Sequence, residues 1–314
     1  MMKLLQRLNV IAQCKKYRIS LWQCPSFLFL IMGIIICLVA IISYLIGTRY
    51  ITEPRIVALI VLIVCAILLI LSFIITNSFE KLLEANRLKS EFINIVSHQL
   101  RAPLSNLSWA IELLMSGRVG RIEREQVDYF KILKENSDRM KDLVKDLLIV
   151  SKIESAQLFL KKEEFNLEEL TKEIIKEFEY FAKASNCQIE FVAKENLPKI
   201  FGDRYQLRQV IENLLDNAIR YTKEKGKVTI EIKKEKNFIR FEISDNGVGI
   251  PREDQKFIFQ KFFRASNVLK HKTQGTGLGL YIAKEIIERS GGKIGFKSQE
   301  GVGSTFWFTL PIKS

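Results

Sequence analysis

Two stretches of this 314-residue chain contain no charged side chain, residues 27–47 and 56–76. Each has about the 20 apolar residues that an α-helix needs to cross the hydrocarbon core of a bilayer. A soluble domain rarely needs so long an apolar run. A cleaved signal peptide is disfavoured because the segment before the first stretch is long and offers no small-residue cleavage site. The sequence therefore predicts two transmembrane helices.

Acidic side chains are absent from the first 26 residues. The basic residues there are Lys3, Arg7, Lys15, Lys16 and Arg18. By the positive-inside rule this N-terminus is cytoplasmic, and two crossings return the rest of the chain to the cytoplasm. Its charge also suits anionic lipid headgroups. Residues 48–55 are too few to fold, which excludes an extracytoplasmic ligand-binding domain.

Metal-binding and disulfide spacings are also missing. The five cysteines are odd in number and are predicted to be reduced thiols: Cys14, Cys24, Cys37, Cys65 and Cys187. The net charge of +13 raises the question of nucleic-acid binding. We expect none, because the lysines alternate with acids and no groove-reading motif is present.

Short motifs in the remaining sequence indicate phosphoryl transfer. His98 lies in the apolar, helical string Ser97-His98-Gln99-Leu100-Arg101-Ala102-Pro103-Leu104. Four further strings follow in order: Asn213 to Ala218, Asp245 to Ile250, Phe259 to Arg264 and Gly275 to Leu280. Taken alone, each string has a purely structural explanation. The histidine can be a solvated or core residue, and the glycines can form a turn. Together they place an imidazole acceptor and a phosphate-binding loop on one polypeptide.

In this order the strings resemble the H, N, G1, F and G2 boxes of bacterial membrane-bound sensor histidine kinases of two-component systems. The resemblance covers roughly residues 77–314. It implies an α-helical hairpin that forms a four-helix bundle on dimerisation, followed by an α/β-sandwich ATP-binding domain of the histidine kinase and gyrase type.

The expected organisation has six segments. These are a basic cytoplasmic N-terminus (1–26), the first transmembrane helix (27–47), a short extracytoplasmic loop (48–55), the second transmembrane helix (56–76), a signalling helix with the dimerisation and histidine phosphotransfer domain (77–158), and the catalytic ATP-binding domain (159–314).

Apolar residues recur at three- and four-residue steps on both predicted hairpin helices, on the first after Pro103 and on the second from about Glu125 to Glu154. The stripe stays half exposed in one hairpin, so a homodimer is expected to cover it. No HAMP-like linker is recognisable between Thr76 and His98. Val228–Lys233 and Phe238–Ser244 alternate and predict paired strands. Asp203 is predicted to open a capping box with Gln206.

The resemblance also assigns the nucleotide site. Asn217, with Asn213, is expected to hold Mg²⁺ through amide oxygens, since magnesium suits neutral oxygen ligands that leave waters in place. Arg220 is expected to meet phosphate oxygens, and Tyr221 continues the same helical face. Asp245 is expected to accept the adenine amine, although Asp-Asn-Gly is also a strong turn string.

Glycines are expected where the backbone must approach the nucleotide closely. Gly247 and Gly249 would let the chain pass beside the adenine ring. Gly275, Gly277, Leu278 and Gly279 would form the phosphate cradle at a helix N-terminus. Residues 252–274 resemble the flexible ATP lid, in which His271 is interpreted as a solvated residue.

The sequence departs from the family at two positions near the acceptor. Neutral His98 is expected to attack the γ-phosphorus, with catalysis mainly by positioning and charge neutralisation. Most relatives have Glu or Asp after the histidine, and here Gln99 keeps an acceptor but loses the charge, which predicts slower autophosphorylation. Ala102 replaces a Thr or Asn that aligns water, which predicts weak or absent phosphatase activity.

The leading hypothesis is a homodimeric inner-membrane, multi-pass histidine kinase that uses ATP and Mg²⁺ to phosphorylate His98. It would pass the group to an aspartate in the receiver domain of a separate response regulator. Two alternatives stay open: a catalytically weak ATP-binding membrane scaffold, and an ATPase of the same nucleotide fold that moves rather than phosphorylates.

Overall fold

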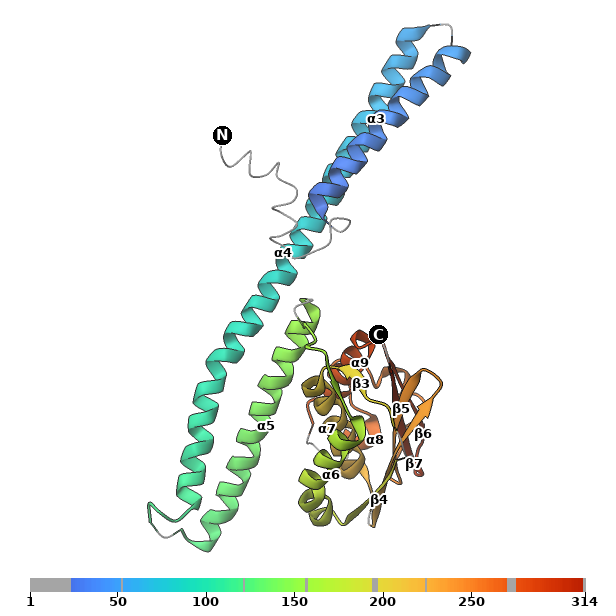
Figure 1. The fold of residues 1–314 in the computed structure, drawn as a ribbon. Helices are drawn as coiled ribbons and strands as arrows, with labels where there is room; N and C mark the ends of the chain where they lie inside the picture. Colours follow the sequence, from blue (N-terminus) through green and yellow to red (C-terminus); the bar gives the residue numbers. More distant parts are fainter. Residues whose placement is uncertain are drawn as a thin grey trace. The chain divides into compact units, whose positions relative to one another are not determined.

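The computed structural model describes residues 24–51, 53–120, 122–155, 158–193, 197–223, 225–269 and 275–312. The predicted cytoplasmic N-terminus therefore lies almost wholly outside the described residues. Contacts divide the chain into two compact units, Met1–Phe92 and Ile93–Ser314, which are described in turn (Figure 1).

The first unit contains α3 (Pro25–Tyr50) and the first part of α4 (Pro54–Met115). Pro25 starts α3, where a proline costs no intrahelical hydrogen bond. Both helices are long and apolar enough to cross a membrane, and large side chains such as Leu38 and Leu62 are exposed along them. These exposed apolar surfaces are consistent with the two predicted transmembrane helices. The observed helices are longer than the uncharged stretches 27–47 and 56–76, and only residues 51–53 lie between them.

Cys24, just before α3, is disulfide-bonded, so the prediction of a reduced thiol is wrong at this position. Sequence spacing alone does not show which cysteines come within bonding distance in three dimensions. Cys37, Cys65 and Cys187 are free thiols, as predicted.

In the second unit, the His98-bearing part of α4 and α5 (Arg124–Glu154) form the predicted helical hairpin. Glu123 and Gln126 form a reciprocal capping box that starts α5. Across the hairpin the Ser108 and Ser137 hydroxyls are 2.8 Å apart and buried. Several apolar side chains on these two helices are exposed: Leu107, Trp109, Leu133 and Met140. The hairpin therefore retains the half-exposed apolar stripe that its sequence predicts.

The rest of this unit is an α/β sandwich. Its five-stranded sheet has the order β2-β4-β5-β7-β6. The strands are β2 (Cys187–Ala193), β4 (Gly226–Glu235), β5 (Phe238–Asp245), β6 (Lys293–Gln299) and β7 (Gly303–Pro311). β2 runs parallel to β4, and the other neighbours are antiparallel. The predicted pairing of the strands now called β4 and β5 is confirmed.

One face of the sheet is covered by α6 (Leu167–Ala184), α7 (Arg204–Tyr221) and α9 (Gly279–Arg289) (Figure 1). Period-2 alternation on the strands turns Ile230, Phe241 and Phe308 toward these helices, where each is fully buried. The Phe241 and Phe308 rings stack with centroids 4.8 Å apart. A two-stranded antiparallel sheet of β1 (Glu163–Phe165) and β3 (Ile200–Gly202) precedes α7.

Asp203 caps α7 and so fixes the helix that carries the Asn213 string. Its Oδ1 accepts the Gln206 N–H at 3.0 Å. The predicted capping box is only half formed, since Gln206 Oε1 is buried without a partner among the described residues. Asp203 Oδ2 also accepts the Lys161 N–H at 2.8 Å, which ties the segment just before β1 to the start of α7.

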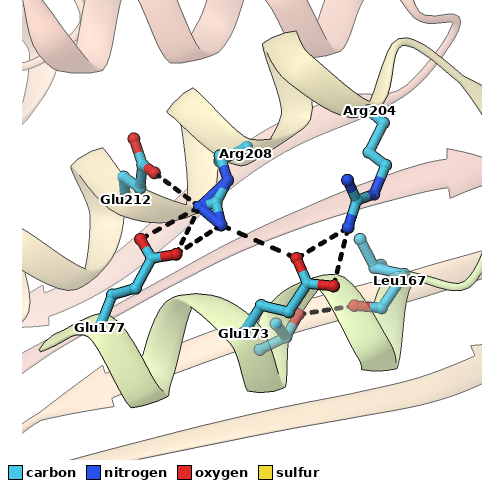
Figure 2. A network of polar contacts seen from close by, with 7 residues as sticks. Leu167, Glu173, Glu177, Arg204, Arg208 and Glu212 are labelled. Carbon is cyan, nitrogen blue, oxygen red and sulfur yellow. Dashed lines mark hydrogen bonds and ion pairs between the residues drawn. The ribbon is translucent and has the colours of Figure 1, made fainter. Parts of the chain in front are cut away.

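Ion pairs hold α6 against α7 on their outer side (Figure 2). Arg204 Nη2 is 2.7 Å from Glu173 Oε2. Arg208 contacts Glu177 at 2.9 Å and Glu212 at 3.4 Å, and its side chain is only 24% exposed. Burial raises the pKa of the Glu212 carboxyl, and the Arg208 charge offsets part of that rise. Arg208 therefore compensates a partly desolvated carboxylate.

We expect Arg208→Met to lower the free energy of unfolding by about 1 kcal/mol and Tm by about 3 °C. Methionine keeps the aliphatic stem but leaves the Glu212 charge without its cation. Differential scanning calorimetry measures the change. Lys183→Met is the matched control, because its pair with Glu179 is solvent-exposed. Equal losses in the two variants would contradict the idea that partial burial strengthens this network.

Candidate functional site

A cavity of about 830 Å³ lies between α5, α7, the end of β5 and the glycine loop before α9. Nine residues proposed from the sequence line it: Asn213, Asn217, Arg220, Tyr221, Asp245, Gly249, Gly275, Gly277 and Gly279. These come from segments up to 66 positions apart, from Asn213 to Gly279. The fold therefore brings the sequence strings that begin at Asn213, Asp245 and Gly275 to one site.

Asp245 is the last residue of β5, and the two oxygens of its carboxylate have different hydrogen-bond partners. Oδ1 accepts the Gly247 N–H at 2.8 Å and the Ser304 N–H at 3.2 Å. Oδ2 accepts no hydrogen bond from the described residues. Burial raises the pKa of Asp245 to about 6, while the two N–H donors act in the opposite direction. One carboxylate oxygen is thus held in place and the other is available to a ligand donor.

Two of the glycines are required by close approaches. A Cβ on Gly247 would lie 2.3 Å from the Tyr221 carbonyl oxygen, so only glycine lets the turn after β5 pack on the end of α7. A Cβ on Gly279 would lie 2.2 Å from Asn213 Nδ2. Glycine at this position lets the N-terminus of α9 approach the Asn213 side chain. The positive end of a helix dipole thereby lies beside the cavity.

Asn213 and Asn217 lie one turn apart on α7 and are hydrogen-bonded. Asn217 Nδ2 donates to Asn213 Oδ1 at 3.0 Å. This bond turns Asn217 Oδ1 away from Asn213, so the Asn217 amide oxygen is the better placed of the two as a metal ligand. The neutral oxygen donors fit Mg²⁺, which keeps several waters and uses few protein ligands. No cluster of three or more His, Cys, Asp or Glu side chains suited to a metal exists among the described residues.

Arg220 and Tyr221 end α7 at the rim of the cavity. Arg220 forms a bidentate pair with Asp216, with Nε–Oδ2 at 3.0 Å and Nη2–Oδ1 at 2.9 Å. Its guanidinium is therefore held by Asp216 at the wall of the cavity. Burial raises the pKa of the Tyr221 hydroxyl, while the Arg264 and Arg220 charges act to lower it.

Leu278 lies in a different environment from its neighbours. Its side chain is fully buried in the core, and it does not line the cavity. Its N–H donates to Thr276 Oγ1 at 3.2 Å. Leu278 can therefore affect ligand binding only through its backbone and through the packing that holds the glycine loop in place.

Sequence reasoning missed the wall contributed by α5. Asp142 and Asp146 line the cavity, and burial raises the pKa of both carboxyls. Asp146 Oδ2 accepts the Thr276 hydroxyl at 2.8 Å. Lys261 pairs with Glu154 further along α5. A polar stripe at four-residue steps on α5 was the available signal, but it is typical of any solvated helix face.

The lid region contributes apolar contacts and an anchored segment. Phe263 of the lid lines the cavity together with Ile250, just before the lid, and Phe306 on β7, and these side chains can pack on a flat ring. Asn267, in α8 (Ser266–Leu269), donates to the Gly249 carbonyl at 3.0 Å. Asp254 accepts the Ser266 N–H at 2.7 Å. The predicted lid residue His271 lies outside the described residues, as do the others from 270 to 274.

His98, Gln99 and Ala102 are exposed on α4. None of them lines the nucleotide cavity. The structure thus gathers most of the proposed nucleotide residues at one site and leaves the proposed acceptor on the surface of the helical hairpin.

Comparison with known proteins identifies two domains in this chain. Residues 88–156 match the His Kinase A (phospho-acceptor) domain, and residues 202–314 match the histidine kinase-, DNA gyrase B- and HSP90-like ATPase. Drug sensory protein A of Synechocystis is 36% identical over an alignment of length 239 that covers 73% of this chain and 36% of that protein. The signal transduction histidine-protein kinase BarA of Escherichia coli is 33% identical over 73% of this chain and 25% of its own length.

Solved structures show the same fold. Full-length ShkA in complex with AMPPNP has a TM-score of 0.59 and 28% identity, covering 70% of this chain and 45% of that one. Histidine kinase ThkA in complex with the response regulator protein TrrA has a TM-score of 0.50 and 29% identity, over 71% of this chain and 61% of that one. This chain spans between 25% and 36% of the length of the curated relatives that it matches.

Proposed function

Because this chain belongs to the sensor histidine kinases, we propose that it transfers the γ-phosphoryl group of ATP to His98 and from there to an aspartate of a response regulator. The observation that carries the proposal is the single cavity lined by Asn217, Asp245 and the Gly275–Gly279 loop, in a chain whose helical hairpin presents an exposed histidine. The ATP-binding domain match and the AMPPNP complex of ShkA support nucleotide binding.

Different cavity residues bind different parts of ATP. Asp245 Oδ2 accepts the exocyclic amine of adenine, which selects adenine over guanine because guanine has a carbonyl oxygen at that position. Ile250 and Phe306 pack on the ring. The backbone amides of the glycine loop and the N-terminus of α9 receive the phosphates, and Arg220 adds a positive charge at the rim.

Mg²⁺ would be held by Asn217, positioned by its hydrogen bond to Asn213, and would neutralise charge on the phosphates. At the acceptor, His98 Nε2 attacks the γ-phosphorus in line. The N–P bond forms as the bond from phosphorus to the bridging oxygen of ADP breaks. The Nδ1 proton of the resulting cation is released, and the Gln99 amide oxygen can orient that N–H but cannot take its proton.

The proposed partners follow from the same parts. A second copy of the chain would cover the exposed apolar stripe of the hairpin, in keeping with the phospho-acceptor domain match. The response regulator is supported by the ThkA–TrrA complex. We place α3 and the start of α4 in the bacterial inner membrane as two crossings, with membrane lipid around them and the kinase domains in the cytoplasm. No nucleic-acid partner is proposed.

Incubation with γ-labelled ATP and Mg²⁺ tests the proposal against its alternatives. The kinase acquires an acid-labile, alkali-stable label. A scaffold binds nucleotide without labelling, and an ATPase releases phosphate without forming a phosphorus–nitrogen bond. The scaffold is the disfavoured alternative, because both domains of the family are present and the similar proteins are kinases.

We expect Gln99→Glu to raise the initial rate of labelling on the order of 10- to 100-fold, because a carboxylate adds general-base assistance to the attack of His98. Rapid-quench measurements with saturating labelled ATP give the rate. Gln99→Met is the matched control, since it has similar length but no acceptor and should be slower than the parent chain. An unchanged rate in Gln99→Glu would show that the missing charge does not limit the reaction.

We expect Ala102→Thr to raise dephosphorylation of a phosphorylated response regulator by about tenfold, since a hydroxyl one turn after His98 can align the attacking water. Ala102 is exposed, so threonine costs little beyond helix propensity. Ala102→Val has the same shape without the hydroxyl and should stay at the parent level. Efficient phosphatase activity in the parent chain would contradict this prediction.

A further inference from the structure

A second cavity, of about 990 Å³, lies between α6 and β2 and shares no lining residue with the nucleotide cavity. Its floor is apolar: Ile175 comes from α6, and Ile189 and Phe191 come from β2. All three side chains are only partly buried. This α6–β2 groove is therefore an apolar surface that the described residues leave uncovered.

Lysines surround the α6–β2 groove. The lining lysines are Lys172, Lys176, Lys183, Lys225 and Lys227. Glu179 is the one acidic residue in the lining. Lys172, Lys183 and Lys227 each have a carboxylate partner within 3 Å. Lys176 and Lys225 form no ion pair with any carboxylate in the described part of the chain, so the rim keeps a positive charge.

β2 is also the edge strand of the sheet, and among the described strands it pairs only with β4. A strand with one neighbour presents a row of backbone N–H and C=O groups on its other side. The end of the groove at the start of β2 is fixed, because the Gly226 N–H donates to the Asn186 carbonyl at 3.0 Å and the Lys227 N–H donates to Asn246 Oδ1 at 2.8 Å.

We propose that the α6–β2 groove docks an acidic segment of a partner protein, which adds to the sheet as a strand beside β2. In such a segment alternate apolar side chains pack on Ile175, Ile189 and Phe191, and the acidic side chains reach the lysine rim. Main-chain hydrogen bonds supply affinity and the alternate side chains supply specificity. Lysines on an edge strand can also serve only to prevent pairing, but β2 itself contains no lysine, and that role requires no hollow, apolar floor beside the strand.

The probe is a fluorescein-labelled heptapeptide of alternating glutamate and valine, matched to the seven residues of β2. Fluorescence anisotropy with the full chain in nanodiscs of uncharged lipid reports its binding. A peptide with lysine in place of every glutamate is the charge control. We expect the acidic peptide to bind at least about tenfold more tightly than the basic one.

Two variant pairs separate this groove from general basicity. Lys176→Glu with Lys225→Glu should weaken binding by about tenfold. Lys293→Glu with Lys297→Glu makes the same charge change on β6, at the opposite edge of the sheet, and should leave the affinity unchanged. Hydrogen exchange should show slower exchange of β2 amides when the acidic peptide is bound.

Equal losses in the two pairs, or β2 amides whose exchange is unaffected by the peptide, would overturn the proposal. So would the absence of binding by the acidic peptide. Labelling of His98 from ATP in all variants is measured alongside and is expected to persist. Failure of the kinase assignment would leave this groove and its test unaffected.

Discussion

His98→Gln will abolish the acid-labile label that the chain acquires from γ-labelled ATP, because glutamine has no nucleophilic ring nitrogen. The expected loss is complete within detection. ATP binding should stay within about twofold of the parent chain, since His98 does not line the nucleotide cavity. Acid and alkali treatment of the labelled band, with isothermal titration of ATP, gives both readouts.

The chain provides an internal control for this substitution, because His271 is its other histidine. His271→Gln should retain the label. A label that persists in His98→Gln would assign the phosphoryl group to another residue. A loss of label in both variants, with ATP binding retained, would move His271 from the lid into the reaction itself.

Asp245→Asn will weaken ATP binding by roughly 10- to 150-fold, the cost of losing a hydrogen bond to a charged group. Asparagine keeps the shape of the side chain, and its oxygen can still accept the Gly247 and Ser304 N–H groups. The variant lacks the negative oxygen that we propose as the acceptor of the adenine amine. Glu253→Gln, an exposed charge change in the lid, is the control and should bind ATP normally.

The raised pKa of Asp245 gives this prediction a pH dependence. The carboxyl ionises at about pH 6 in the fold, so its affinity for the adenine amine should fall as the pH drops through 6. Adenosine is the appropriate ligand, because it has no phosphates that titrate in the same range. A step in adenosine affinity near pH 6 that disappears in Asp245→Asn is the expected result. An identical step in both proteins would assign it to another group.

The free energy of unfolding depends on pH in the opposite direction. A carboxyl whose pKa is higher in the folded than in the unfolded chain favours folding at low pH, and this contribution is lost as the pH rises from 3.8 through about 6. The nucleotide-free protein therefore carries the cost of an ionised, partly buried Asp245 at neutral pH. Asp245→Asn removes that charge, so its Tm without nucleotide should not fall.

The parts of the site that could be predicted from sequence are those set by local pattern. The buried face of α7, its Asp203 cap and the alternation of β4 and β5 all depend on residues a few positions apart. Asn213 and Asn217 share a helix face for the same reason. Asp245 could be placed at a strand end because Asp-Asn-Gly follows an alternating stretch.

The remainder depends on contacts between distant segments. Thr276 and Asp146 are 130 positions apart, and a carboxylate on a helix surface gives no sign of its future partner. Asp203 likewise accepts the Lys161 N–H across 42 positions, a bond that the local capping pattern does not reveal. The disulfide of Cys24 is likewise a matter of proximity in space.

The hydrogen bond from Thr276 to Asp146 joins the glycine loop to α5. Any rearrangement of the hairpin that separates these two side chains removes a restraint on the loop, and so alters its affinity for nucleotide. Thermodynamic linkage then requires the reverse effect by the same factor. If the hairpin has two such arrangements, nucleotide bound at the loop would favour the orientation of α5 that keeps this hydrogen bond.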